Sequence, residues 1–133
     1  MGKKFNTEFL EAYIDLDSAC AKALDVNRSG VTEYINRLKS DPYISPTDET
    51  LKRLIGYRKT RNKLAHEEGA LADMDEIDKS DIRWLKDFCK AIIKGKDPLS
   101  LAHRELSLKK IVLWGAAAVC IVIAIIAILL ITK

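Results

Sequence analysis

Residues 111–131 read IVLWGAAAVCIVIAIIAILLI, and this stretch decides how the rest of the chain is organised. Its 21 positions include no charged residue and no proline. As a helix it would be about 31 Å long, which matches the hydrocarbon core of a bilayer. A chain of this size cannot surround such a helix on every side, so a buried core helix is disfavoured. The stretch therefore predicts a single transmembrane helix.

Lysines flank this stretch: Lys109 and Lys110 precede it and Lys133 follows it. By the positive-inside rule, the lysine pair places the N-terminal part in the cytoplasm, at the inner (plasma) membrane if the protein is bacterial. No apolar run near the N-terminus is typical of a signal peptide, so we expect a C-terminal tail anchor. Since the helix contains no ionisable residue, it offers no ion path or proton relay of its own.

The remainder of the chain carries balanced charge. All 19 acidic residues and 19 of the 22 basic residues lie in residues 1–105, so the net charge of +3 comes from the three lysines beside the apolar stretch. This balance gives no support by itself to nucleic-acid binding. The odd set of Cys20, Cys89 and Cys120 lacks metal-ligand spacing and indicates a reducing compartment without disulfides.

Apolar residues at three-and-four spacing predict four helices before residue 98. Turn signals bound them at about residues 7–24, 31–40, 48–67 and 81–94. A short juxtamembrane helix is expected to begin at Leu99. The sequence thus predicts an all-α protein, with an up-and-down bundle of four helices in residues 1–98, a linker helix in residues 99–110 and a transmembrane helix in residues 111–131.

The third predicted helix departs from a regular amphipathic pattern. On a helical wheel of about 100° per residue, Lys59 and Lys63 lie opposite the apolar face, as in a solvated helix. Arg58 and Arg61 instead fall within about 40° of the centre of that face. An arginine directed at a small core is costly unless it is paired, because its charge cannot be removed by deprotonation.

Two explanations fit these arginines. They could pair with Glu11, Asp15 or Asp17 of the first helix, or extend past their neighbours into water. Alternatively, the edge meets a second surface, such as another subunit, and a polar cleft lies there. Because Asn62 and His66 follow along the same edge, we favour the cleft.

Charge is also segregated around this helix. Residues 52–63 contain six basic residues and no acidic one, whereas residues 67–81 contain seven acidic residues. Such runs indicate a solvated face and a solvated loop, which is the favoured interpretation for Lys59 and Lys63. The alternative is a helix that attracts RNA phosphates through Arg58, Lys59 and Lys63, beside an acidic loop that limits non-specific binding.

From Arg61 to His66 the sequence reads RNKLAH. This motif closes a third helix and precedes a loop and an amphipathic helix, and over about residues 5–98 the chain resembles the HEPN superfamily. Many HEPN domains are metal-independent endoribonucleases that act as toxins or in defence against phage and mobile elements. They dimerise so that two motifs line one cleft. The resemblance implies Arg61 and His66 as the catalytic pair, with Asn62 in support.

These residue types suit RNA cleavage by the 2′-hydroxyl of the RNA itself. A histidine that titrates near neutrality can move the protons, and a guanidinium can hold the phosphate as negative charge accumulates. The spacing places Arg61 and His66 about 140° apart on a helix. We therefore expect a composite site between two subunits, in which Arg58 holds a second phosphate.

No other chemistry has a comparable motif. Glu67 and Glu68 lack a second ligand at metal spacing, and His103 is expected at the surface. His66 alone would equally fit a histidine stabilised by the dipole of the helix C-terminus. We expect no metal or cofactor, an RNA substrate, a homodimer, and an antitoxin or membrane-resident partner. The alternatives are a non-catalytic HEPN module that binds RNA, nucleotide or protein, and a membrane adaptor without a nucleic-acid role.

Overall fold

The computed structural model describes residues 2–44, 48–66 and 77–132. The regular structure within these ranges is helical, in the order α1 (Gly2–Leu24), α2 (Gly30–Ser40), α3 (Glu49–His66), α5 (Lys79–Ile93) and α6 (Pro98–Ile131). The chain divides into a compact unit, residues 1–100, and a second unit, residues 101–133, that consists almost entirely of the remainder of α6. The predicted all-α class is confirmed.

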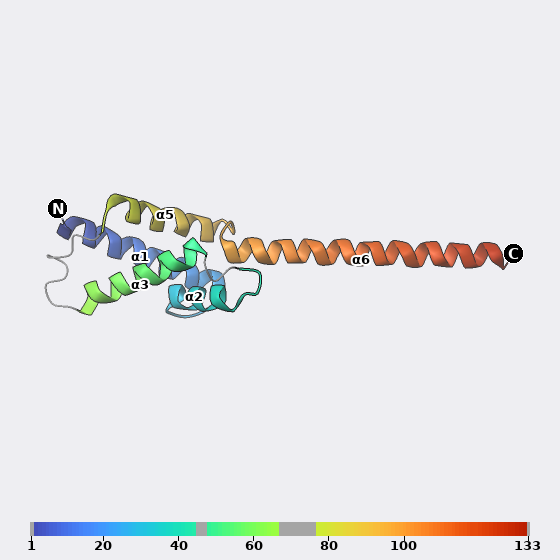
Figure 1. Ribbon diagram of the computed structural model, residues 1–133, viewed down its shortest axis with the longest axis horizontal. Coiled ribbons are helices and arrows are strands. Elements are labelled where there is room, and N and C mark those ends of the chain that lie inside the picture. The colour runs from blue at the N-terminus through green and yellow to red at the C-terminus, as the bar shows by residue number, and fades with distance from the viewer. Residues whose placement is uncertain (1, 45–47, 67–76, 133) are drawn as a thin grey trace. The chain divides into compact units, whose positions relative to one another are not determined.

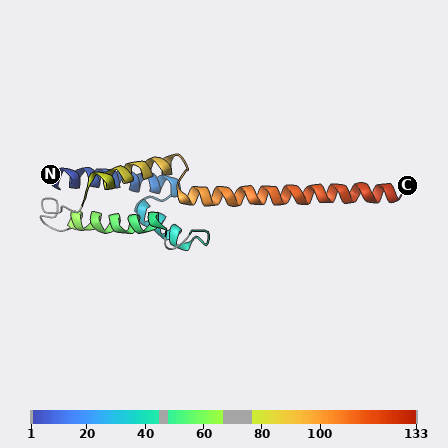
Figure 2. The same cartoon turned by 45° about the horizontal axis from the view of Figure 1, so that its top comes forward.

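The helix α1 is central to the compact unit. Its apolar residues recur at three-and-four spacing, and Phe9, Leu16 and Cys20 are fully buried. The helix α5 lies along one side of α1, while α2 and α3 lie against another side (Figures 1 and 2). Their buried residues form one core that reaches to Leu99 in the first turn of α6. The apolar positions whose spacing predicts these helices are buried or partly buried, except that Ala23, Ala65 and Ile93 are exposed.

The directions of the helices differ from an up-and-down bundle. Glu8 near the start of α1 lies beside Ile82 of α5, and Ala19 near the end of α1 lies beside Ile92. The helices α1 and α5 therefore run in the same direction, and Figure 1 shows α3 running opposite to both. The up-and-down prediction was wrong because α2 has only 11 residues and crosses the end of α1 instead of returning along it.

Gly30 allows α2 to cross α1 closely. Asp17 accepts a hydrogen bond from the backbone nitrogen of Val31 at 2.8 Å. This bond caps the first turn of α2 in place of Ser29, whose side chain makes no capping bond. A Cβ at position 30 would overlap the backbone of Asp17 and Ala21. The contact between the two helices therefore requires glycine.

We expect Gly30→Ala to lower the free energy of unfolding by about 1–3 kcal/mol, because the added methyl group forces α2 away from α1. Gly56→Ala is the matched control, since a Cβ at position 56 in α3 would meet nothing within 4 Å. Alanine there should stabilise the protein by about 0.5–1 kcal/mol through its helix propensity. Urea unfolding followed by circular dichroism measures both changes. A Gly30→Ala chain as stable as the wild type would contradict the close crossing.

Two helix boundaries differ from the expected ones. The helix α1 begins at Gly2, ahead of the expected start near residue 7. The helix α6 is continuous from Pro98 to Ile131, where a linker helix and a separate transmembrane helix were expected. No glycine, proline or turn signal lies between residues 99 and 111, so nothing in the sequence interrupts the helix there.

The first turn of α6 is tied to the core of the compact unit. The carboxylate of Asp97, which is buried, accepts a hydrogen bond from the Tyr34 hydroxyl of α2 at 2.7 Å. It also accepts hydrogen bonds from the backbone nitrogen of Ser100 at 3.2 Å and from the Ser100 hydroxyl at 2.5 Å. Asp97 thus caps α6 and satisfies the buried phenol of Tyr34.

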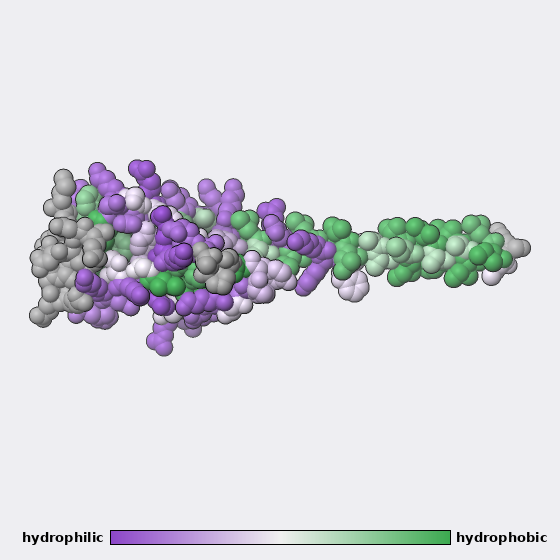
Figure 3. All heavy atoms as spheres, viewed as in Figure 1, coloured by the Kyte–Doolittle hydropathy of each residue, from purple (hydrophilic) through white to green (hydrophobic). Residues whose placement is uncertain are grey.

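Among the described residues, α6 is the one helix that is long and apolar enough to cross a membrane. Every residue from Ile111 to Ile131 is exposed. Figure 3 shows apolar side chains over the visible face of this segment, whereas polar and charged side chains dominate the visible face of the compact unit. The segment thus has the length and composition of a bilayer-spanning helix.

Candidate anion-binding cleft

A polar cleft lies where α3 meets α1 and the first turn of α2. Its volume of about 420 Å³ falls within the range of roughly 300–1,000 Å³ that is typical of ligand sites. The three helices each contribute to its wall, which is formed by Tyr13, Ile14, Asp17, Ser18, Ser29, Thr32, Arg58, Arg61 and Asn62.

Arg58 and Arg61 supply the positive charge of the cleft. Both are half-buried, and α3 directs them toward α1. Within residues 2–44, 48–66 and 77–132, no carboxylate lies within 4 Å of either guanidinium, whereas Arg37 and Arg53 both form ion pairs. The alternative in which the cleft arginines pair with carboxylates of α1 is therefore not found in this part of the chain.

Tyr13 contributes a hydrogen-bond donor to the same cleft. Its side chain is only 5% exposed, and its hydroxyl has no hydrogen-bond partner among the residues that the structure describes. Burial, and to a lesser extent the Asp17 carboxylate, raise the pKa of Tyr13 to about 12, although the positive charges of Arg61 and Arg58 oppose the rise. The hydroxyl therefore keeps its proton at neutral pH and can donate a hydrogen bond.

Asp17 supplies the negative charge of the cleft. One of its carboxylate oxygens is occupied by the backbone nitrogen of Val31. Two guanidinium groups and one carboxylate leave the cleft with an excess of positive charge. Such a cleft attracts anions, and forked guanidinium groups are well suited to phosphate or carboxylate oxygens.

The predicted site residues divide into two groups. Arg58, Arg61 and Asn62 line the cleft, and the amide oxygen of Asn62 accepts a hydrogen bond from Nη1 of Arg61 at 3.2 Å. The other predicted residues are exposed and are not part of the cleft wall: Lys59, Lys63 and His66. For the two lysines this agrees with the solvated-face interpretation.

His66 lies apart from the cleft because of helix geometry. The helix α3 stays regular up to His66, so it does not unwind to bring the histidine back toward Arg61. Because His66 follows Arg61 by five residues, the two side chains point about 140° apart around the helix axis. In one chain, the imidazole and the cleft therefore lie on different faces of α3. The acidic loop that was predicted to follow lies mostly in residues 67–76, outside the described residues.

Sequence reasoning did not find five residues of the cleft: Tyr13, Ile14, Ser18, Ser29 and Thr32. Tyr13 follows the apolar pattern of α1, which is typical of a core residue, and it does pack in the core as well as lining the cleft. Ser29 and Thr32 reach the cleft because α2 lies so close to α1, and a helical wheel does not describe contacts between helices. The adjacent Ser29-Gly30 pair at the start of α2 was the one available signal of a close approach.

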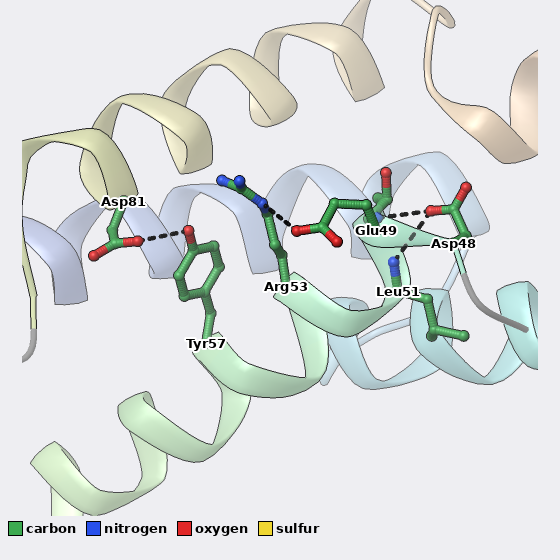
Figure 4. A network of polar contacts seen from close by, with 7 residues as sticks. Asp48, Glu49, Leu51, Arg53, Tyr57 and Asp81 are labelled. Atoms are coloured by element: carbon green, nitrogen blue, oxygen red, sulfur yellow. Dashed lines mark hydrogen bonds and ion pairs between the residues drawn. The ribbon is translucent and has the colours of Figure 1, made fainter.

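The other side of α3 is anchored by the polar contacts in Figure 4. The Tyr57 hydroxyl donates a hydrogen bond to Asp81 of α5 at 2.8 Å. Arg53 pairs with Glu49 at 3.2 Å and lies 5.8 Å from the centre of the Trp84 ring. These groups find their partners inside the chain, whereas the arginines of the cleft have no carboxylate partner among the described residues. This network therefore holds α3 in place and leaves the cleft as the candidate ligand site.

No group of three or more histidine, cysteine, aspartate or glutamate residues with metal-binding geometry occurs within the described ranges. The second histidine, His103, is exposed on α6. The chemistry available in the cleft is therefore that of guanidinium, hydroxyl, amide and carboxylate groups.

The fold and the cleft define a small helical domain with an arginine-lined polar cleft, followed by a helix that is long and apolar enough to cross a membrane. The sequence matches the model of a family of unknown function, DUF6548, over residues 7–113, and the chain belongs to this family. The matched region includes every residue of the cleft and ends within the apolar stretch of α6. No curated protein and no solved structure matches the chain.

Proposed function

We propose that this protein is a membrane-tethered, HEPN-type endoribonuclease that needs no metal and acts as a toxin or in defence against phage or mobile elements. The observation that carries the proposal is the pair Arg58 and Arg61, which face a polar cleft without a carboxylate partner in the described chain. Both arginines lie on α3, which ends in His66, and Arg61 begins the RNKLAH motif that His66 closes.

In the proposed reaction, the 2′-hydroxyl oxygen of RNA attacks the adjacent phosphorus while the bond from phosphorus to the 5′-oxygen breaks. Arg61 binds the reacting phosphate, and Asn62 orients the Arg61 guanidinium through their hydrogen bond. His66 moves protons, which leave the attacking hydroxyl and reach the departing oxygen. The products are a 2′,3′-cyclic phosphate and a free 5′-hydroxyl. Arg58 binds a neighbouring phosphate.

A second copy of the chain completes the proposed site. In one chain, His66 is exposed and outside the cleft that contains Arg61. A homodimer can place His66 of one copy at the cleft of the other, and twofold symmetry then forms two equivalent composite sites, each with Arg61 from one copy and His66 from the other. Exposure of His66 at the end of α3 makes it accessible to a partner.

The apolar part of α6 suits a membrane anchor for this enzyme. Lys109 and Lys110 precede it, so the positive-inside rule favours a cytoplasmic compact unit, at the inner (plasma) membrane in a bacterium. Cellular RNA is then on the same side as the cleft. An antitoxin or a membrane-resident protein is the partner that would restrain or localise such an activity.

Arg61→Ala tests the proposal in the full chain, purified in detergent. The wild type should cut single-stranded RNA in the presence of EDTA and leave 2′,3′-cyclic phosphate ends. Loss of one group that stabilises the transition state should reduce the rate by about 10²–10³-fold. Arg53→Ala is the matched control, because Arg53 lies on α3 outside the cleft and should cut normally. Intact RNA with the wild type in every condition would refute the nuclease.

The position of His66 favours a second candidate, a non-catalytic HEPN module that binds RNA, a nucleotide or a protein partner at the membrane. Within one chain, the cleft contains the groups that bind a phosphate, but no histidine. This candidate predicts RNA binding that weakens steeply with salt, without any cleavage. A gel assay of RNA cleavage and a titration of RNA binding, both with the purified wild-type chain, distinguish the two candidates.

A further inference from the structure

The Tyr13 hydroxyl is a donor in the wall of the cleft; it is not fully buried, and it has no acceptor among the described residues. The phenol of a largely buried tyrosine usually finds a hydrogen-bond partner. The buried phenol of Tyr34 follows this rule, because it donates to Asp97 at 2.7 Å. Tyr57, which is partly buried, does so as well, because it donates to Asp81. The hydroxyl of Tyr13 has no such partner among the described residues.

The neighbours of Tyr13 explain why an acceptor from the chain is missing. Arg58 and Arg61 have only N–H donors, so neither guanidinium can accept the tyrosine proton. Asp17 lies one helical turn further along α1, and its carboxylate caps α2 through Val31. The cleft therefore presents three donor groups, from two helices, none of which is bonded to a carboxylate of the described residues.

We propose that the Tyr13 hydroxyl donates a hydrogen bond to a phosphodiester oxygen of single-stranded RNA, whose charge is neutralised by Arg58 and Arg61 in the same cleft. The inference rests on the proposed function for the identity of the ligand as RNA, but it does not require that the RNA be cut. Tyr13 becomes a ligand-binding residue that lies outside the RNKLAH motif.

A phosphodiester fits the cleft better than a neutral ligand or a cation. Two permanent positive charges repel cations and leave an excess of positive charge over the single Asp17 carboxylate. A phosphate offers several acceptor oxygens, so it can engage both guanidinium groups and the tyrosine hydroxyl together. The volume of about 420 Å³ also leaves room for the sugar next to the hydroxyls of Ser29 and Thr32.

The test is the affinity of Tyr13→Phe for a fluorescent single-stranded RNA oligonucleotide, measured by anisotropy in the full chain. His66→Ala is present in every sample so that the RNA stays intact. Loss of a hydrogen bond to a charged acceptor should weaken binding by about 10-fold or more. The melting temperature should stay the same or rise, because the hydroxyl has no partner to lose.

Tyr57→Phe is the matched control, since its hydroxyl bonds to Asp81 outside the cleft. This variant should bind RNA normally and melt at a lower temperature, the reverse of the pattern expected for Tyr13→Phe. Unchanged RNA affinity in Tyr13→Phe would overturn the proposal. A loss of affinity together with a lower melting temperature would assign the hydroxyl a structural role and would overturn it as well.

Competition identifies the chemical group that Tyr13 binds. The dissociation constants of inorganic phosphate and of a ribonucleoside monophosphate, derived from their displacement of the oligonucleotide and its own affinity, should be lower for the Tyr13 chain than for the Tyr13→Phe chain. Equal dissociation constants of these competitors in both chains would contradict a phosphate at the hydroxyl. If RNA binds through Tyr13 but is never cut by the chain with His66 intact, the nuclease fails and this inference stands. If the Tyr13→Phe chain binds RNA as well as the Tyr13 chain does and cuts it at the same rate, this inference fails and the nuclease stands.

Discussion

His66→Ala should reduce RNA cleavage by about 10²–10⁴-fold, which is the contribution of a positioned general acid or base. The side chain is exposed at the end of α3 and is not part of the core. Its removal should therefore change the free energy of unfolding by no more than about 0.5 kcal/mol. The loss of cleavage can then be attributed to chemistry and not to unfolding. RNA binding should remain, because the cleft itself contains no histidine.

The control for this variant is His103→Ala. The chain has two histidines, and His103 is exposed on α6 and is not one of the residues that form the cleft. Its replacement should leave the rate of cleavage unchanged. Cleavage by His66→Ala at the wild-type rate would show that His66 takes no part in the reaction, and would leave the non-catalytic candidate in its place.

Ile121→Arg combined with Ile125→Arg should release most of the chain from membranes. The thirteen isoleucine, valine and leucine residues of the apolar stretch favour insertion by about 0.3–0.6 kcal/mol each. An arginine near the centre of the span costs about 2.5–3.5 kcal/mol, so two of them offset most of the total gain. Alkaline extraction followed by flotation in a density gradient separates inserted protein from soluble or aggregated protein.

The matched control replaces the same two residues by leucine, which keeps the apolar surface and the length of the helix. This chain should float with the membranes, as the wild type does. If the double arginine chain also floats after alkaline extraction, the apolar part of α6 is not what holds the protein in the bilayer. Neither variant alters the compact unit, since residues 121 and 125 lie in the second unit of the structure.

Much of the fold follows from the spacing of apolar residues. The positions of α1, α2, α3 and α5, and most of the core, were predictable because each helix buries one face. The direction of α2 was not predictable in the same way. It depends on Gly30, which has no side chain and therefore permits α2 to lie on the backbone of α1 at Asp17 and Ala21. The apolar pattern of one helix does not predict how closely another helix approaches its backbone.

The candidate site was predictable only in part. Arg58 and Arg61 stood out because they interrupt an apolar face, and the structure places both in a polar cleft. The sequence did not single out Tyr13 as a site residue, because a tyrosine on an apolar face is equally suited to a core. The helical wheel indicated that Arg61 and His66 point apart, and the regular end of α3 agrees with this. Whether a partner brings them together depends on an interface between chains, which the sequence of one chain does not describe.

Complementation between two inactive variants tests most directly whether Arg61 and His66 act together on RNA across a dimer. When Arg61→Ala and His66→Ala chains are co-expressed in equal amounts, half of the dimers are mixed. Each mixed dimer retains one intact site, with Arg61 from one chain and His66 from the other. We expect the mixture to cut RNA at roughly a quarter of the wild-type rate, because one site in four is intact. A mixture that is as inactive as either variant alone would contradict the composite site.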